Sequence, residues 1–452
     1  MPSHVPGKRR VRRTVAAGIP LATLVAIAAA GTATGVPTGH AASRTAEVTG
    51  SSTLGDIPLA AFSNGLLPGS VDDDRGVDLG GIGSDLYPAG RKGEFWTVTD
   101  RGPNGQIKVD GTKRRTFPVP GFDPAIVKIR VTGERVKVLR SIPLITSSGK
   151  PVTGLPNQEG RDEKPYTSDA GTPLPYNPNG LDTEGIVRAA DGTFWLVDEY
   201  GPSLVHVSAR GKVLARHVPK GLHLKGAGYP VVESLPAILL HRKTNRGFEG
   251  LAQLPGGDLV LAVQSPLSLP DGAAGDASRT TRLLRFSPKK KAVTAEYAYR
   301  FDPVGVVDPG EDDTSELKIS SVVALGDDRL LVEERTDKAA RLQEVRLTRR
   351  ANILGDAWDD AGTSPSLEQL DDPAVAGVPV LGKRLVVDLN TVDGVQDKIE
   401  GVALAGHGTL ALINDNDFGM TEGAGAFDAN GRLVDSGIET KVTYVRLPDG
   451  AF

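Results

Sequence analysis

Apolar residues in this chain occur in short runs that are interrupted by glycine and aspartate turns. One pattern recurs: a lead residue, a short apolar run, a Gly/Asp turn, a second apolar run and a closing polar cluster. Its five copies span residues 81–101, 184–199, 249–264, 320–335 and 400–417. Two apolar runs around a tight turn predict a β-hairpin in each copy. Helices are expected to be scarce, because no long segment keeps an apolar period of 3.6 residues.

Further strand-like runs follow most of the copies. They lie at residues 125–131, 203–207, 282–286, 342–347 and 443–447. A hairpin with outer strands that returns roughly every 50 to 80 residues is typical of the blades of a β-propeller. We therefore expect an all-β fold, a single propeller of six blades or of five. A β-sandwich with coincidental turn similarity is the alternative, and three copies led by Glu-Gly argue against it.

The two ends of the repeat region indicate how such a ring would close. A sixth blade would form if residues 442–447 paired with N-terminal residues near 57–62. Two stretches, near 143–180 and 215–246, interrupt the repeat with many glycines and prolines. Loops of this length are usually functional or mobile, so we interpret them either as a lid or as solvated insertions. The expected repeat domain, with both insertions, covers residues 55–452.

The first 41 residues have the three parts of a secretory signal. The basic start consists of Lys8, Arg9, Arg10, Arg12 and Arg13. An apolar centre follows at 19–30, and Gly39 and Ala41 are the small residues of a cleavage site. A membrane anchor is the alternative, but the apolar centre is short for a span. We expect cleavage before Ala42, export by the general or the twin-arginine route, and a short tail at 42–54.

Charge and composition narrow the classes of function. The chain has a net charge of −4 and no cysteine, which excludes disulfides, thiolate metal sites and a cysteine nucleophile. Loss of the basic signal would leave a more acidic protein, which does not invite nucleic acid or anionic membranes. No Gly-x-Ser-x-Gly elbow occurs, and the histidines show no paired ligand spacing. We expect a secreted, extracellular monomer with a small-molecule substrate and no stable membrane anchor.

The hairpins are expected to bring acidic residues together. In a hairpin, the residue before the first strand and the residue after the second lie at the same end, and the blades of a propeller present equivalent ends to one face. The sequence therefore predicts a ring of acids around one mouth of the central channel. The predicted metal ligands are Glu184, Asp198, Glu249, Glu334, Glu400 and Asp415. Arg101 and Arg335 lie among them in the pattern.

Converging carboxylates repel one another unless a cation compensates their charge. Oxygen ligands without cysteine or a histidine cluster suit Ca²⁺, with Mg²⁺ as the alternative, rather than zinc. A single Glu-Gly is more simply a turn residue, so the site hypothesis depends on the threefold repetition. Residues 308–316 and 415–417 could form separate calcium loops, although neither has the spacing of an EF-hand.

The predicted chemistry needs no serine or cysteine nucleophile. A cation at the propeller mouth would neutralise phosphate charge and activate a water molecule. Arg101 and Arg335 would grip the phosphate oxygens, and Asp100 would orient the water or act as general base. Asp100, Arg101 and Arg335 are therefore the predicted catalytic residues.

Five motifs, taken in order, carry a resemblance to a known family. They are Gly81–Leu86, Thr99–Asn104, Leu181–Ile186, Gly247–Leu251 and Lys398–Val402. Together they resemble the phytase-like family, described as having esterase-like activity of phytase, over roughly residues 55–448. The resemblance implies a β-propeller, export and phosphate-ester hydrolysis. It implies calcium more distantly, by analogy with the alkaline β-propeller phytases, whose dense Asp/Lys/Arg phosphate-binding clusters have no mapped counterpart here.

Two hypotheses of function remain open at this stage. The first is a secreted, cation-dependent hydrolase of phosphate esters or related esters. The second is a non-catalytic secreted propeller that binds a ligand or a protein partner at the same face. Arginines beside acids favour the first, since a phosphate needs positive charge beside the metal.

Overall fold

The structure is a computed structural model that describes residues 45–66, 71 and 73–452. The predicted signal at 1–41 lies outside the described residues and stays a prediction. Most strands can be divided into five groups of four antiparallel strands. The groups are β2 (Tyr87–Pro88), β3 (Glu94–Val98), β6 (Ala125–Thr132) and β7 (Arg135–Pro143); β9 (Thr183–Arg188), β10 (Phe194–Asp198), β11 (Ser203–Val207) and β12 (Val213–Pro219); β14 (Phe248–Gln253), β15 (Leu259–Val263), β16 (Thr280–Ser287) and β17 (Ala292–Arg300); β18 (Lys318–Ala324), β19 (Arg329–Arg335), β20 (Ala340–Arg346) and β21 (Lys383–Asp388); and β22 (Ile399–Gly406), β23 (Thr409–Asn414), β24 (Lys441–Arg446) and β1 (Glu47–Leu54). Two of these groups are joined into one eight-stranded sheet by the parallel pairing of β7 with β1, and a fifth strand, β13 (Val231–Leu235), extends another group.

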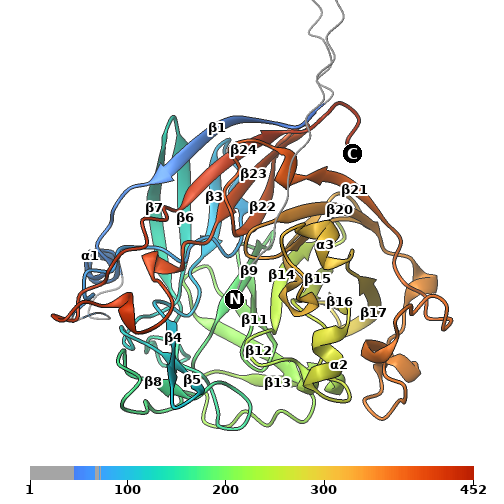
Figure 1. Ribbon diagram of the computed structural model, residues 1–452, viewed down its shortest axis with the longest axis horizontal. Coiled ribbons are helices and arrows are strands. Elements are labelled where there is room, and N and C mark those ends of the chain that lie inside the picture. Colours follow the sequence, from blue (N-terminus) through green and yellow to red (C-terminus); the bar gives the residue numbers. More distant parts are fainter. Residues whose placement is uncertain (1–44, 67–70, 72) are drawn as a thin grey trace, which may run out of the picture. The chain divides into compact units, whose positions relative to one another are not determined.

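The first strands of the groups gather near the centre of the ring of sheets. Figure 1 shows β9, β14 and β22 there, with β12, β17, β21 and β1 farther out. This propeller-like arrangement confirms the all-β fold class. The expectation of six blades is not confirmed, since four-stranded groups number five among residues 45–66, 71 and 73–452.

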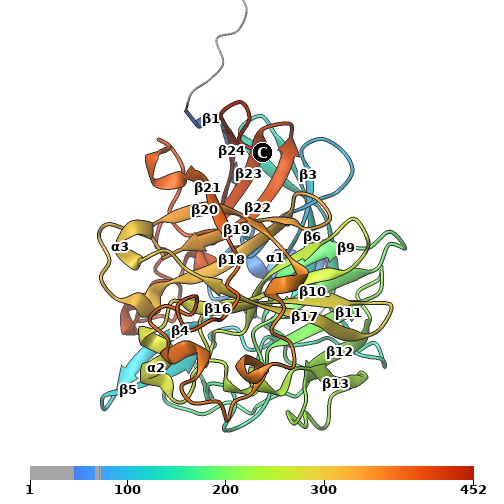
Figure 2. The same cartoon turned by 90° about the vertical axis from the view of Figure 1, so that its right-hand side faces the viewer.

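The ring closes through the N-terminal strand, although not through the predicted residues. Strand β1 pairs with β24 from Glu47 opposite Arg446 to Thr53 opposite Lys441. Figure 2 shows β1, β24 and β23 side by side next to the C-terminus. The prediction of 57–62 as the closing strand is wrong, because that stretch enters helix α1 (Leu59–Leu66). The tail expected at 42–54 is likewise wrong in part, because it contains β1.

Regular elements outside the five groups are short. Strand β13 (Val231–Leu235) runs parallel to β12, while β4 (Gly105–Val109), β5 (Thr112–Thr116) and β8 (Pro165–Tyr166) form a small sheet of their own. The other α-helices are α2 (Gly272–Ala277) and α3 (Val304–Val307). No helix in the described part of the chain reaches the length and apolar content that a membrane crossing requires.

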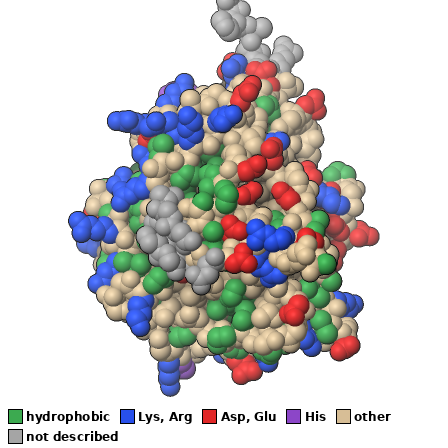
Figure 3. All heavy atoms as spheres, turned by 90° about the vertical axis from the view of Figure 1, so that its left-hand side faces the viewer, with side chains coloured by type: hydrophobic (Ala, Val, Ile, Leu, Met, Phe, Trp, Pro, Cys, Tyr) green, Lys and Arg blue, Asp and Glu red, His purple; other side chains and the backbone are tan. Residues whose placement is uncertain are grey.

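Hydrophobic cores lie between neighbouring groups. In one of them, Val187 and Trp195 of the second group pack with Leu251 and Leu261 of the third. Alternating strand residues supply these contacts, because successive side chains point to opposite faces of a sheet. On the face shown in Figure 3, basic side chains predominate toward the left and upper left, whereas acidic side chains gather on the right together with further basic ones, and hydrophobic side chains lie between them.

The two predicted insertions pack against one another. Asp162 of the first forms a buried ion pair of 2.5 Å with Arg242 of the second. Asn157 of the first accepts a hydrogen bond of 2.8 Å from the buried Arg216. A desolvated charge pair holds its partners in one arrangement, because separating them would leave a buried charge uncompensated. These contacts hold both insertions beside the centre of the ring.

Candidate functional site

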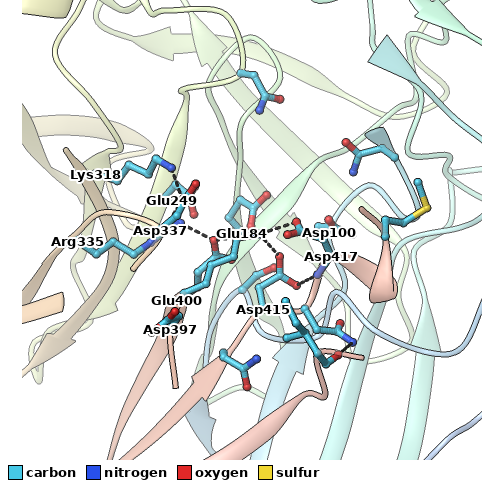
Figure 4. A pocket seen from close by; sticks show the side chains of 18 of the residues that line it. Asp100, Glu184, Glu249, Lys318, Arg335, Asp337, Asp397, Glu400, Asp415 and Asp417 are labelled. Atoms are coloured by element: carbon cyan, nitrogen blue, oxygen red, sulfur yellow. Dashed lines mark hydrogen bonds and ion pairs between the residues drawn. The ribbon is translucent and has the colours of Figure 1, made fainter. Parts of the chain in front are cut away.

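A polar pocket of about 950 Å³ lies where the first strands of the groups begin. Glu184, Glu249 and Glu400 are the second residues of β9, β14 and β22, and all three line it. Asp415 lies just after the second strand of its group and also lines the pocket. Figure 4 shows Glu184 close to Asp100 and Asp415, with Glu249 on the other side. The structure thus brings together acids that are far apart in sequence.

Each Glu-Gly pair has a structural reason. The glutamate faces the pocket, while the glycine lies where a neighbouring strand approaches closely. A Cβ atom at Gly185 would lie 2.6 Å from the Glu249 carbonyl oxygen, and one at Gly250 would lie 2.6 Å from a Val322 methyl. A Cβ at Gly401 would lie 2.8 Å from the carbonyl carbon of Asp85. Any larger residue would push the central strands apart.

The other two groups have different residues in place of the Glu-Gly pair. In β18 the corresponding residues are Ser320 and Ser321. The Ser321 hydroxyl donates a hydrogen bond of 3.2 Å to Asp85, which also accepts one of 2.9 Å from the Ile186 amide. Asp85 therefore connects three groups beneath the pocket. Burial raises the pKa of Asp85 well above its usual range.

Three buried carboxylates of the pocket carry no ion pair within the described part of the chain: Glu184, Glu199 and Glu249. Oxygen atoms of Asp182, Glu184 and Glu199 lie within 4.8 Å of one another. Oε1 of Glu199 and Oε2 of Glu249 are buried without a hydrogen-bond partner. Leaving charged oxygens buried and unpartnered is costly, so this cluster fits a positively charged ligand.

The pKa values of these acids reflect burial and mutual repulsion. Burial, followed by repulsion from Asp182, raises the pKa of Glu199 to about 8. Burial and the neighbouring Glu249 raise the pKa of Glu184 well above its usual range. Burial and Glu400 do the same for the pKa of Glu249. A bound cation would oppose all three effects, because it favours the charged form of each carboxylate.

The opposite side of the pocket contains paired charges. Arg335 donates a hydrogen bond to Glu400 and another of 3.2 Å to Asp337. The Lys398 ammonium lies 2.8 Å from Asp415 and 2.5 Å from Asp417. Burial nevertheless raises the pKa of Asp415 to about 7.

Asp100 and Arg101, two of the predicted catalytic residues, also line the pocket. Arg101 Nη1 lies 3.1 Å from Asp182 and donates a hydrogen bond to Asn245. Asp100 accepts a hydrogen bond of 2.8 Å from the Gly102 amide. Burial, with Asp415 as the next cause, raises the pKa of Asp100 well above its usual range.

Two predicted ligands, Asp198 and Glu334, do not line the pocket. Asp198 is fully buried in an ion pair of 2.6 Å with Arg216 and accepts a hydrogen bond of 2.7 Å from the Asp182 amide. Glu334 binds Lys383 and accepts a hydrogen bond of 2.6 Å from Tyr299. The structure therefore does not bring these two predicted ligands together with the other four, because their side chains point to the opposite face of their strands.

Several pocket residues were missed from the sequence. Asp182 and Lys398 stand two positions before a Glu-Gly glutamate, and Glu199 directly follows Asp198. Arg246 also lines the pocket, from the second insertion. The sequence shows that these residues are polar, but it does not show whether their side chains point into the pocket.

The raised pKa values predict how stability depends on pH without metal. A carboxylate whose pKa is raised by folding binds its proton more tightly in the folded state. Its stabilising effect is complete below the unfolded pKa and is lost as pH rises through the folded value. For Glu199 and Asp415, with folded pKa values of about 8 and about 7, the loss runs from about pH 4 to about pH 8. Thermal unfolding in chelator should show Tm falling by roughly 5 °C over this range. A Tm that rises over this range would contradict the burial of uncompensated acids.

The chain is similar to several known proteins in sequence or in structure. A curated relative from Arthroderma benhamiae, named an uncharacterized secreted protein, is 26% identical over 299 residues, covering 57% of this chain and 58% of the relative. The chain therefore spans a little over half of that relative's length. A PQQ-bound aldose sugar dehydrogenase from Streptomyces coelicolor aligns over 90% of this chain and 98% of its own, with 12% identity and a TM-score of 0.32. Virginiamycin B lyase from Staphylococcus aureus aligns over 78% of this chain and 99% of its own, with 11% identity and a TM-score of 0.28.

Structural alignments with TM-scores this low do not establish a relationship between proteins. The match to a family model does. The model of the family described as "Phytase-like: Esterase-like activity of phytase" matches residues 77–418, which is well over half of the chain. The match includes the strands that carry all three Glu-Gly pairs. The chain belongs to the phytase-like family.

Proposed function

We propose that this protein is a secreted hydrolase of phosphate esters, or of related esters, that depends on a divalent cation in the pocket. The observation that carries the proposal is the set of three buried carboxylates without an ion pair, Glu184, Glu199 and Glu249. Membership of the phytase-like family supports ester hydrolysis as the reaction class. The specific substrate is part of the proposal and awaits experiment.

The donor set fits a hard cation. Asp182, Glu184 and Glu199 offer carboxylate oxygens within one coordination sphere, and Glu249 adds an unpartnered oxygen beside them. All donors are oxygen, which suits Ca²⁺ and, as the alternative, Mg²⁺. Such an ion would supply positive charge to the substrate oxygens and lower the pKa of a nearby water. This ligand set replaces the one predicted from sequence.

The basic residues of the pocket would hold the anionic substrate. Arg101 has an Nε that is buried without a hydrogen-bond partner. Lys113 and Arg115 reach the pocket from β5, beside Arg101. Arginine offers several N–H groups in a plane, which matches the oxygens of a phosphate. Arg335 would serve the same purpose from the opposite wall, where it also holds Glu400.

Asp100 would act on the attacking water, either by orienting it or by accepting its proton. Its carboxyl group lies in the pocket close to Asp415 and Glu184, and burial together with Asp415 raises its pKa, which strengthens it as a base. We therefore keep Asp100 as the proposed general base or water-orienting residue.

Secretion and blade count belong to the same proposal. The basic and apolar N-terminal segment supports export, and a relative is named a secreted protein. The five four-stranded groups support a propeller with five blades.

An assay of metal-depleted protein tests the function. Phytate, simple phosphate monoesters and carboxylate esters would be offered with and without added Ca²⁺. We expect hydrolysis only with the ion. Glu249→Gln and Arg101→Ala should each lower the rate by about 100-fold or more, and only the first should sharply weaken Ca²⁺ binding. Glu439→Gln, at an exposed acid of the pocket rim, is the control that should keep full activity.

The same assay can contradict the proposal. If Ca²⁺-loaded protein hydrolyses no ester in this panel, the catalytic proposal fails. The remaining function would then be that of a non-catalytic propeller that binds a ligand or partner at the same face.

A further inference from the structure

We infer that Lys398 is a tethered cation that neutralises one half of the pocket and thereby limits the pocket to a single divalent ion. The inference rests on the proposed cation site and concerns how many ions that site can hold. It would make Lys398 a positioning residue for the ion, since the lysine decides which of the acids remain available.

The pocket has two halves that differ in pairing. The first half consists of Asp182, Glu184, Glu199 and Glu249, and the second half of Asp337, Glu400, Asp415 and Asp417. In the first half, three of the four carboxylates have no ion pair within the described residues. In the second half, each of these four carboxylates contacts a lysine or arginine. Asp100, with Asp415 and Asp182 as its acidic neighbours, lines the pocket without an ion pair within the described residues. The buried acids that remain for an external cation are therefore those of the first half.

The repeat itself explains this difference. The position two residues before the glutamate, or before Ser320 in β18, is Asp182, Gly247, Lys318 or Lys398 in successive groups. The same place in the fold thus carries a negative charge in the second group and a positive charge in the fourth and fifth. One substitution within the repeat changes whether a group adds an acid to the pocket or neutralises one.

The surroundings of the Lys398 ammonium resemble those of a bound ion. Its Nζ lies 2.8 Å from Asp415, 2.5 Å from Asp417 and 3.9 Å from Glu400. Three carboxylates around one positive charge are an arrangement that would otherwise need a cation from solution. The lysine supplies that charge from within the chain.

The backbone of Lys398 is held in an unusual conformation. Its φ is +50°, in the left-handed region that non-glycine residues rarely adopt. Its amide donates a hydrogen bond of 3.0 Å to the Asp337 carbonyl, and its carbonyl accepts one of 3.1 Å from the Asp415 amide. These bonds hold the backbone on both sides, which keeps the side chain directed at the second half of the pocket.

Ion stoichiometry tests the inference. The full chain, stripped of metal, would be titrated with Ca²⁺ by calorimetry and with Tb³⁺ by luminescence. We expect one ion for the wild type and two for Lys398→Met, because Asp415 and Asp417 then lose their internal cation. Lys398→Gly is the second variant, since glycine adopts a positive φ freely and protects against misfolding. Lys441→Met, at a lysine of the pocket rim, should keep one ion.

The outcomes separate this inference from the proposed function. A wild type that binds no ion, with Lys398→Gly binding one, would refute the proposed cation site and support the tethered lysine. Folded Lys398 variants with the same stoichiometry as the wild type would overturn the inference and leave the cation site standing. Weaker binding of inorganic phosphate with unchanged stoichiometry would also overturn it, because Lys398 would then serve the substrate.

Discussion

Deletion of residues 1–54 is expected to prevent folding, whereas deletion of residues 1–44 should leave a folded protein. The longer deletion removes β1, which is the fourth strand of the last group and also contacts β7 through Thr53 and Leu54. Without it, β24 becomes an open edge and the buried face of the last group is exposed. The deletion removes the contact between the first and last groups, so we expect the whole domain to remain unfolded.

Far-UV circular dichroism and thermal unfolding would measure this effect. The deletion of 1–44 keeps every described strand and is the matched control, with an expected Tm close to that of the full chain. A protein lacking residues 1–54 that unfolds cooperatively within about 2 °C of this control would show that β1 does not close the ring.

The second large effect is a difference in stability between variants of two adjacent acids, Asp198 and Glu199. Asp198→Asn should lower the free energy of unfolding by about 3 kcal/mol, because Arg216 would remain buried without its counter-charge. Glu199→Gln should leave this free energy unchanged or raise it in metal-free buffer, because it removes a buried carboxylate that has no ion pair. Ca²⁺ should raise the Tm of Asp198→Asn as it does for the wild type, and should not raise that of Glu199→Gln.

Denaturant unfolding and thermal shifts in chelator and in Ca²⁺ would check both variants. Since the two residues are neighbours in sequence, each variant is the control of the other. Equal destabilisation by both, or a Ca²⁺ response that depends on Asp198, would contradict the assignment of Asp198 to the fold and Glu199 to the pocket.

The same pair shows how far the sequence could be used for prediction. The repeated apolar runs were sufficient to predict hairpins whose ends meet, and Glu184, Glu249 and Glu400 do line one pocket. The direction of a residue at the end of a strand was not predictable. Successive side chains alternate in direction, and a bulge changes the alternation. Such an irregularity lies between Leu196 and Asp198, where β10 pairs with β9.

The closing strand was missed for a related reason. Strand β1 has the sequence EVTGSSTL, with few apolar residues and mostly partial burial. A strand at the outer edge of a group packs on little core, so its pattern carries a weak signal. The buried Leu59 and Phe62 mark the stretch that was predicted instead, but they belong to one face of the short helix α1.

The pairing of β1 with β24 also determines when folding can finish. Glu47 and Arg446, which contact one another across this pair, are 399 positions apart. The first strand of the ring therefore pairs only after a strand nearly 400 positions later has been synthesised. Contacts of such long sequence separation form slowly, because loop-closure entropy opposes them. The last group therefore stays open until both of these strands are available, whatever the order in which the other groups form.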